Sequence, residues 1–197
     1  MNVKEHYDRL IEEDNDPFFD PPELQAYMDG WDGPEFMAAM QLDGSERVLE
    51  IGVGTGRLAN RAAPCCRHLT GIDLSPKTIK RAAQNLQRHP NVDLICGDFL
   101  KHPFAERFDV IYSSLTMMHF EDKQQVLRKV DALLKPGGRF CLSIDKNPSR
   151  YIDMGVRKLQ IYPDAVEETL RNIGATSMQV VNTIEKEFAH ILVCRKQ

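Results

Sequence analysis

The chain has 197 residues, a length that fits one domain able to bury a hydrophobic core. Hydrophobic residues make up 42% and charged residues 27%, as in soluble globular proteins, and no apolar run resembles a signal peptide or a membrane span. The net charge of -4 argues against a nucleic-acid partner. We therefore expect a cytoplasmic protein, monomeric or homodimeric, without a nucleic-acid or membrane partner.

The first 46 residues differ in composition from the rest of the chain. Proline and aspartate concentrate in "DNDPFFDPPEL", and the only tryptophan, Trp31, lies between two glycines in "DGWDGPEF". The stretch "EHYDRLIEED" places Tyr7 on the apolar side of a short helix. We expect residues 1–46 to form a helical arm or cap and residues 47–197 to form the main domain. The aromatic residues of the arm either line a substrate pocket or anchor the arm to the domain.

From residue 47 onward, apolar runs alternate with amphipathic helical stretches. The runs "RVLEIG", "HLTGIDL", "VDLICGDF", "FDVIYSSL" and "GRFCLSID" are short and rich in β-branched or aromatic residues, as buried strands are. The helix in "SPKTIKRAAQNLQRH" has Ser75 as its N-cap and Pro76 at its first position, and the next helix ends at Pro136. This alternation predicts a parallel sheet with helices on both faces. After a last helix over 164–173, "MQVVNTIEKE" and "AHILVCRK" predict an antiparallel hairpin, which makes the sheet mixed.

Five cysteines are present, an odd number without C-x-x-C spacing: Cys65, Cys66, Cys96, Cys141 and Cys194. Four of them lie beside apolar residues in the expected helices or strands. This placement favours buried free thiols over disulfides, and no metal site is predicted.

The stretch "VLEIGVGTGRLA" places three glycines, Gly52, Gly54 and Gly56, between an expected strand and an expected helix. Glycine is needed where φ is positive or where a Cβ would collide with a ligand, so the loop predicts a ligand at the carboxyl edge of the sheet. Asp73 follows Gly52 by 21 positions, at the end of the next strand. An acid that accepts the hydroxyls of a ribose is expected at a separation of about 20 residues.

The same loop lacks the fingerprint of a dinucleotide site. G-x-G-x-x-G requires a glycine at the sixth position, but Arg57 or Ala59 stands there. Glu50, at the mouth of the loop, would repel a pyrophosphate and suits a ligand that carries an amino group. The residues therefore predict a ligand with a ribose, a cationic end and no phosphate. An NAD-dependent oxidoreductase is the less favoured alternative.

Five segments resemble, in order, the motifs of class I S-adenosylmethionine-dependent methyltransferases, especially the small-molecule (methyltransferase type 11/25-like) branch: "VLEIGVGTG", "GIDLS", "CGDFL", "FDVIYSSLTMMHF" and "LLKPGGRFCLS". They cover about residues 46–145, and the hairpin after Gly174 resembles the family's last two strands. The resemblance implies a Rossmann-like α/β fold with a seven-stranded mixed sheet in the order 3-2-1-4-5-7-6, the last strand antiparallel. It also implies methyl transfer from S-adenosylmethionine to a small-molecule acceptor, with release of S-adenosylhomocysteine. A non-catalytic S-adenosylmethionine-binding partner protein is the alternative.

The resemblance also implies which residues contact the donor. Glu50 is expected near the methionine amino group, and the glycine loop near the methionine and ribose. The cofactor-binding candidates are Glu50, Gly52, Gly54, Thr55, Gly56, Asp73 (ribose), Leu74 and Phe99 (adenine ring), Asp98 (adenine amino group) and Ser113 (methionine side). Each has a structural alternative: the glycines form a tight turn, Asp98 caps a turn or helix, and Leu74 belongs to the core.

Two residues are candidates for contact with the reacting atoms. His119 follows the strand that faces the transferring methyl group in the family, and an imidazole can accept a proton near neutral pH. Tyr7 lies in an arm that, in related proteins, folds over the donor. The alternatives are a structural or partly exposed histidine and a tyrosine packed on the surface. The segment "SSLT" lacks the D/N/S-P-P-Y/F pattern of enzymes that methylate nucleobase amines or glutamine amides.

Overall fold

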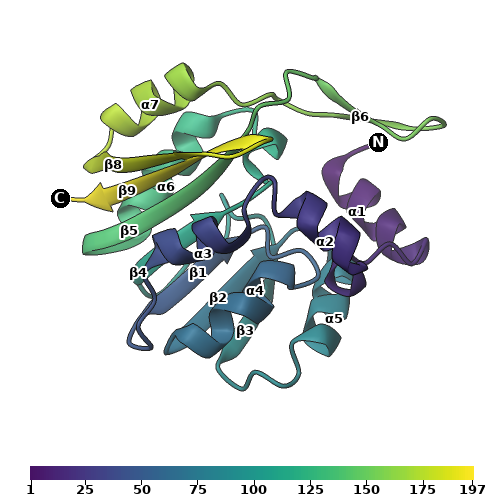
Figure 1. The fold of residues 1–197 in the computed structure, drawn as a ribbon, viewed down its shortest axis with the longest axis horizontal. Helices are drawn as coiled ribbons and strands as arrows, with labels where there is room; N and C mark the ends of the chain where they lie inside the picture. Colours follow the sequence, from purple (N-terminus) through teal and green to yellow (C-terminus); the bar gives the residue numbers. More distant parts are fainter.

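A seven-stranded sheet forms the centre of the protein in the computed structural model, which describes all 197 residues (Figure 1). The strand order is β3-β2-β1-β4-β5-β9-β8. The strands are β1 (Arg47–Ile51), β2 (His68–Asp73), β3 (Val92–Cys96), β4 (Phe108–Ser113), β5 (Leu134–Asp145), β8 (Met178–Glu185) and β9 (Ala189–Lys196). The pairs β1–β2, β1–β4, β2–β3 and β4–β5 are parallel, whereas β9 runs antiparallel to both β5 and β8. Numbered within the sheet, this is the predicted order 3-2-1-4-5-7-6 with an antiparallel last strand, so the predicted fold class is confirmed.

Helices cover both faces of the sheet, as predicted (Figure 1). One face packs against α3 (Gly33–Met40), α4 (Arg57–Ala62) and α5 (Pro76–Asn85), and the other packs against α6 (Lys123–Leu133) and α7 (Val166–Gly174). Side chains alternate between the two faces along each strand. In β1, Val48 belongs to the core beneath α3 and α4, whereas Leu49 belongs to the core beneath α6.

The capping residues fix where the helices begin. Ser75 accepts a hydrogen bond from the backbone N–H of Thr78, and Pro76 is the first residue of α5, as predicted. This helix ends at Asn85, earlier than the predicted end at His89. His89 precedes Pro90, and a residue before proline is disfavoured in helical geometry.

The first 46 residues form three helices and a short 3-10 turn. These are α1 (Val3–Glu12), η1 (Pro17–Phe19), α2 (Pro22–Met28) and α3. Phe36 and Met40 of α3 are fully buried in the main core, so the predicted division at residue 46 places one core helix within the arm. In contrast, α1 lies outside this core, near the loops that follow the carboxyl ends of the strands and beside the segment that contains β6 (Figure 1).

A small hairpin was not predicted from the sequence. It consists of β6 (Tyr151–Asp153) and β7 (Lys158–Gln160) and lies between β5 and α7 in the chain. Leu159 and Ile161 pack against Met118, and Val3 of α1 packs on the same cluster. Each strand has only three residues, too few to give an alternating pattern in the sequence.

All five cysteines are free thiols, but they are less uniformly buried than predicted. Cys66, Cys141 and Cys194 are buried, whereas Cys65 and Cys96 are exposed. Cys65 ends the short 3-10 turn η2 (Ala63–Cys65), and Cys96 is the last residue of the edge strand β3; apolar sequence neighbours do not ensure burial at either place. None of the helices is both long enough and apolar enough to cross a membrane.

Candidate functional site

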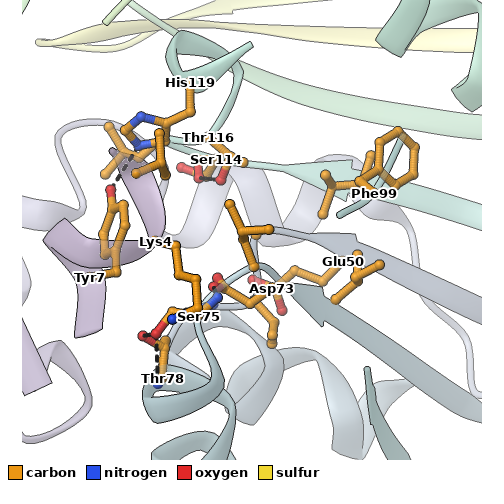
Figure 2. A pocket seen from close by; sticks show the side chains of 18 of the residues that line it. Lys4, Tyr7, Glu50, Asp73, Ser75, Thr78, Phe99, Ser114, Thr116 and His119 are labelled. Carbon is orange, nitrogen blue, oxygen red and sulfur yellow. Dashed lines mark hydrogen bonds between the residues drawn. The ribbon is translucent and has the colours of Figure 1, made fainter. Parts of the chain in front are cut away.

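A cavity of about 580 Å³ lies at the carboxyl ends of β1, β2, β3 and β4. Its walls come from the loops that follow these strands, from the start of α4 and from α1, which contributes Tyr7 (Figure 2). Parallel strands bring the loops after their carboxyl ends to one edge of the sheet, where ligands of such folds bind. Most of the predicted site residues meet here. Gly56 and Ser113 are the two that do not border the cavity.

The glycine loop gives the cavity its floor. Gly52 has φ +77°, and a Cβ there would lie 2.1 Å from Oγ1 of Thr116, so the loop after β4 packs directly on its backbone. Gly54 has φ +56°, and a Cβ there would meet no protein atom within 4 Å. The backbone of Gly54 is therefore open to a ligand, together with the neighbouring Thr55. A Cβ on Gly56 would lie 2.8 Å from Leu86, so this glycine serves the packing of α5 instead.

Asp73, the last residue of β2, is held in a fixed orientation beside the loop. One carboxylate oxygen accepts a hydrogen bond from the N–H of Gly54 at 3.1 Å, and the other accepts from the N–H of Ser75 at 2.9 Å. Burial raises the pKa of this carboxyl group above its usual value. Oriented by backbone donors, the carboxylate can accept the hydroxyls of a ribose. Leu74 stands next to it at the cavity wall and is 40% exposed.

Glu50 is a buried acid at the other side of the loop. Its side chain accepts a hydrogen bond from the hydroxyl of Tyr112 at 2.7 Å, and the residue is only 3% exposed. Burial raises its pKa to about 8, although Tyr112 and Arg57 lower it in part. Burial therefore favours the protonated form of Glu50 near neutral pH. An ammonium group entering the cavity would replace this proton as the partner of the carboxylate, which fits the predicted amino group of the ligand.

The loop after β3 closes the adenine side predicted from the sequence. Asp98 accepts a hydrogen bond from the N–H of Leu100 at 2.8 Å, so it does form the turn considered as its structural alternative, and it borders the cavity as well. Phe99 is 4% exposed, and part of its surface lines the cavity.

Ser113 is not a lining residue, which corrects the sequence prediction. It is fully buried, and its hydroxyl donates to the carbonyl of Ile51 at 3.2 Å. Side chains alternate along β4, so the next residue, Ser114, reaches the cavity instead. Its hydroxyl donates to a carboxylate oxygen of Asp32 at 2.8 Å.

Tyr7 and His119 meet across the cavity from α1 and from η3 (Met117–His119), as Figure 2 shows. The Tyr7 hydroxyl lies 2.8 Å from Nε2 of His119. Burial and the neighbouring His6 lower the pKa of His119 to about 4, so the imidazole is neutral at physiological pH. Burial raises the pKa of Tyr7, which keeps its hydroxyl protonated. The second ring nitrogen of His119, Nδ1, is buried without a hydrogen-bond partner.

Helix α1 is held over the cavity by contacts at Asp8, within the helix, and at Glu13, its C-cap. Asp8 accepts a hydrogen bond from the Ser75 hydroxyl at 2.7 Å and from the backbone N–H of Lys77 at 3.3 Å, at the start of α5. Glu13, the C-cap of α1, pairs with Arg157 of the β6–β7 hairpin at 2.6 Å. Helix α1 therefore contacts α5, which follows Asp73, and the β6–β7 hairpin, which lies on the other side of the cavity entrance from α5.

An ion pair that sequence reasoning missed joins the arm to the glycine loop. Arg57, the first residue of α4, donates to both carboxylate oxygens of the fully buried Asp32, at 3.0 Å and 2.6 Å. The two residues are 25 positions apart in the chain, and no sequence pattern relates them. Only the fold brings them together. Trp31 proves to be an anchor: its indole N–H donates to Asp145 at 3.0 Å, and its ring packs on Phe188.

The fold and the cavity define a class of protein before any comparison is made. A doubly wound sheet, a glycine loop leading into a helix and an acid at the end of β2 are features of nucleotide-type ligand sites. The pattern of the loop is not that of a dinucleotide site. Residues 49–142 match the family model described as a methyltransferase domain. This match covers the glycine loop and Asp73, and it agrees with the resemblance to class I S-adenosylmethionine-dependent methyltransferases that the motifs indicated.

Known proteins similar to this chain vary in their acceptors. Phosphoethanolamine N-methyltransferase 1 of Triticum aestivum is 34% identical over 112 residues, 55% of this chain and 22% of the relative. Ubiquinone biosynthesis O-methyltransferase of Coxiella burnetii is 32% identical over 110 residues, 54% of this chain and 47% of the relative. The chain thus spans less than half the length of these curated relatives.

A solved structure matches over the whole chain. It is the N-methyltransferase NodS from Bradyrhizobium japonicum WM9 in complex with S-adenosyl-L-homocysteine. The TM-score is 0.73 at 21% identity, and the match covers 100% of this chain and 99% of the other. At this identity the likeness shows a shared fold. The donor of the family is S-adenosylmethionine, and the residues around the cavity fit it: a buried acid for its amino group, an oriented acid for its ribose and an open glycine between them.

Proposed function

We propose that this protein is an S-adenosylmethionine-dependent methyltransferase (EC 2.1.1.-) that acts on a small-molecule acceptor and releases S-adenosylhomocysteine. One observation carries the proposal: a single cavity joins the oriented Asp73 and the buried Glu50 to a tyrosine and histidine pair on its opposite wall. The first group of residues suits the donor, and the second suits a nucleophile aligned with the methyl group.

The residues of the chain chiefly bind and position. Bound S-adenosylmethionine supplies a methyl group already activated by its sulfonium, so the protein needs to align the acceptor and to exclude water. We assign the ribose to Asp73, the amino group to Glu50, and the adenine to Leu74, Asp98 and Phe99. Gly52, Gly54 and Thr55 leave room for the donor between them.

We assign Tyr7 and His119 to the acceptor. Both line the cavity, and their mutual hydrogen bond fixes the direction of the hydroxyl and of the ring. A neutral imidazole and a protonated phenol can each exchange hydrogen bonds with a nucleophile. In this proposal, residues 1–46 act as a cap that brings Tyr7 to the site. A cytoplasmic location is supported by five free thiols, two of them exposed.

Donor binding is the first test. Calorimetry with S-adenosylhomocysteine should give binding in the micromolar range, and Asp73→Ala should weaken it at least tenfold because the ribose loses its acceptor. Asp93→Ala, at an exposed acid in the neighbouring strand β3, is the matched control and should bind normally. No heat of binding at millimolar ligand would contradict the proposal.

Turnover is the second test, because binding alone also fits a non-catalytic donor-binding protein. Donor labelled in its methyl group should transfer the label to a component of a metabolite extract. Tyr7→Phe and His119→Gln should reduce this transfer without weakening the binding of S-adenosylhomocysteine. Label transfer that is unchanged in both variants would remove these residues from the site of reaction.

A further inference from the structure

The charged groups around the cavity are predominantly acidic. Five carboxylates border it against two permanent cations, Lys4 and Arg57. The carboxylates belong to Glu50, Asp73, Asp98, Glu121 and Asp122. The excess remains even when Glu50 carries its proton. A cleft lined mainly by one sign of charge concentrates ligands of the opposite sign, so these walls favour a neutral or cationic acceptor over an anion.

Both cations already have a carboxylate partner. Lys4 pairs with Asp8 at 2.6 Å, and Arg57 forms its two hydrogen bonds with Asp32. Asp32 is fully buried, so drawing Arg57 away toward a phosphate would leave an uncompensated charge in the interior. The cavity therefore offers no unpaired cation to a phosphorylated acceptor.

The helix N-termini at the cavity, which often bind phosphate, are capped by side chains. At α5, Ser75 accepts from the N–H of Thr78 at 3.0 Å, and Asp8 accepts from the N–H of Lys77. At α6, Asp122 accepts from the N–H of Gln125 at 2.9 Å. The start of α4 has no side-chain cap, but it follows the glycine loop assigned to the donor.

The tyrosine and histidine pair is poorly suited to removing a proton from a hydroxyl group. A carboxylate behind a histidine would increase its basicity, but Nδ1 of His119 has no partner and Nε2 faces the Tyr7 hydroxyl. The adjacent ring of His6 contributes no negative charge. The low pKa of His119, about 4, agrees with this geometry. The Tyr7–His119 pair therefore favours a nucleophile that can attack without first giving up a proton to it.

We propose that the acceptor is a small, unphosphorylated amine that attacks in its neutral form and is oriented by Tyr7 and His119; this inference rests on the proposed function. The nitrogen lone pair forms the new N–C bond while the C–S bond breaks and sulfur keeps the bonding electrons. The methylated ammonium then loses its extra proton to water. Leu10, Ile11 and Met28 line the cavity and contact the hydrocarbon part of the amine.

Binding to the protein saturated with S-adenosylhomocysteine tests the charge argument. Calorimetry compares ethanolamine with phosphoethanolamine, and a series of larger primary amines with their phosphorylated counterparts. We expect the unphosphorylated member of each pair to bind at least tenfold more tightly. Asp8→Asn, which frees Lys4, should narrow this preference. Tighter binding of the phosphorylated members, or no binding by any amine of the series, overturns the proposal.

Turnover tests the requirement for a neutral amine. Tyramine carries both an amine and a phenol, and mass spectrometry should find the label on nitrogen only. Across amines of different basicity, the inflection of kcat/KM against pH should follow the pKa of each amine. His119→Gln should lower kcat without moving that inflection. Methylation of the phenol oxygen, or an inflection common to all amines, overturns the proposal, whereas failure of S-adenosylhomocysteine to bind contradicts the proposed function itself.

Discussion

Glu50 shows how one buried carboxyl group can make donor binding depend on pH. Burial raises its pKa to about 8, against 4.5 for an ordinary glutamate, and the nearby charges of Arg57, Asp32 and Asp73 modify this value. The group must lose its proton to pair with an ammonium. Below pH 8, each unit of acidification should therefore weaken the binding of S-adenosylhomocysteine by up to about tenfold.

Calorimetry between pH 6 and 8.5 measures this dependence. In buffers of different ionisation enthalpy, the heat should reveal close to one proton released at pH 7. Glu50→Gln has a similar shape and no ionisable group, so its affinity should be lower and nearly independent of pH. An equally steep pH dependence in the variant would assign the released proton to another group.

Gly52 and Gly54 should respond differently to the same substitution. Gly52→Ala combines a positive φ with a Cβ 2.1 Å from Thr116, so it should lower the free energy of unfolding by about 2 to 3 kcal/mol. Gly54→Ala meets no protein atom, so it should cost about 1 kcal/mol from its φ alone and chiefly impair donor binding. Urea unfolding and calorimetry separate the two effects. Adding Thr116→Gly should recover part of the loss in Gly52→Ala and none in Gly54→Ala.

At the scale of elements, α1 and α5 are joined by Asp8. Its carboxylate caps the start of α5, the helix that follows Asp73. Asp8→Ala should therefore disturb both the position of α1 over the cavity and the proposed donor site. A lost cap contact lowers stability by about 1 kcal/mol, and if the bound state depends on this contact, S-adenosylhomocysteine binding should weaken by up to about fivefold. Arg9→Gln is the control on the same helix, because Arg9 is exposed. Equal effects of the two variants would contradict a specific role for Asp8.

At the scale of the whole molecule, the arm should unfold together with the sheet. Trp31 is the only tryptophan, and it contacts Asp145 and Phe188, while α3 buries Phe36 in the main core. Tryptophan fluorescence and far-ultraviolet circular dichroism should therefore report one coincident transition in urea. An earlier fluorescence transition would mean that the arm detaches before the domain unfolds.

The alternation of strands and helices was sufficient to predict a parallel sheet covered on both faces, because each strand and the helix after it repeat a local pattern. The order of the strands followed from the resemblance to the methyltransferase family. The same locality explains why Asp73 lies beside the glycine loop as expected, since both belong to one strand–helix–strand unit formed by β1, α4 and β2. Ser113 was misplaced by a single step of the strand alternation. The pairing of Arg57 with Asp32 and the short β6–β7 hairpin depend on long-range packing, which leaves no periodic signal in the sequence.

The outer edge of α1 is held by ion pairs at the protein surface: Glu13 with Arg157, and Glu12 with Lys77. A movement of this helix away from the cavity would have to break both pairs. Dissolved salt weakens exposed pairs because the screening length shortens from about 10 Å at 0.1 M to about 3 Å at 1 M. If release requires this movement, the dwell time of the bound product should shorten as ionic strength rises, and stopped-flow measurements of S-adenosylhomocysteine release at 0.1 M and 1 M salt would show it.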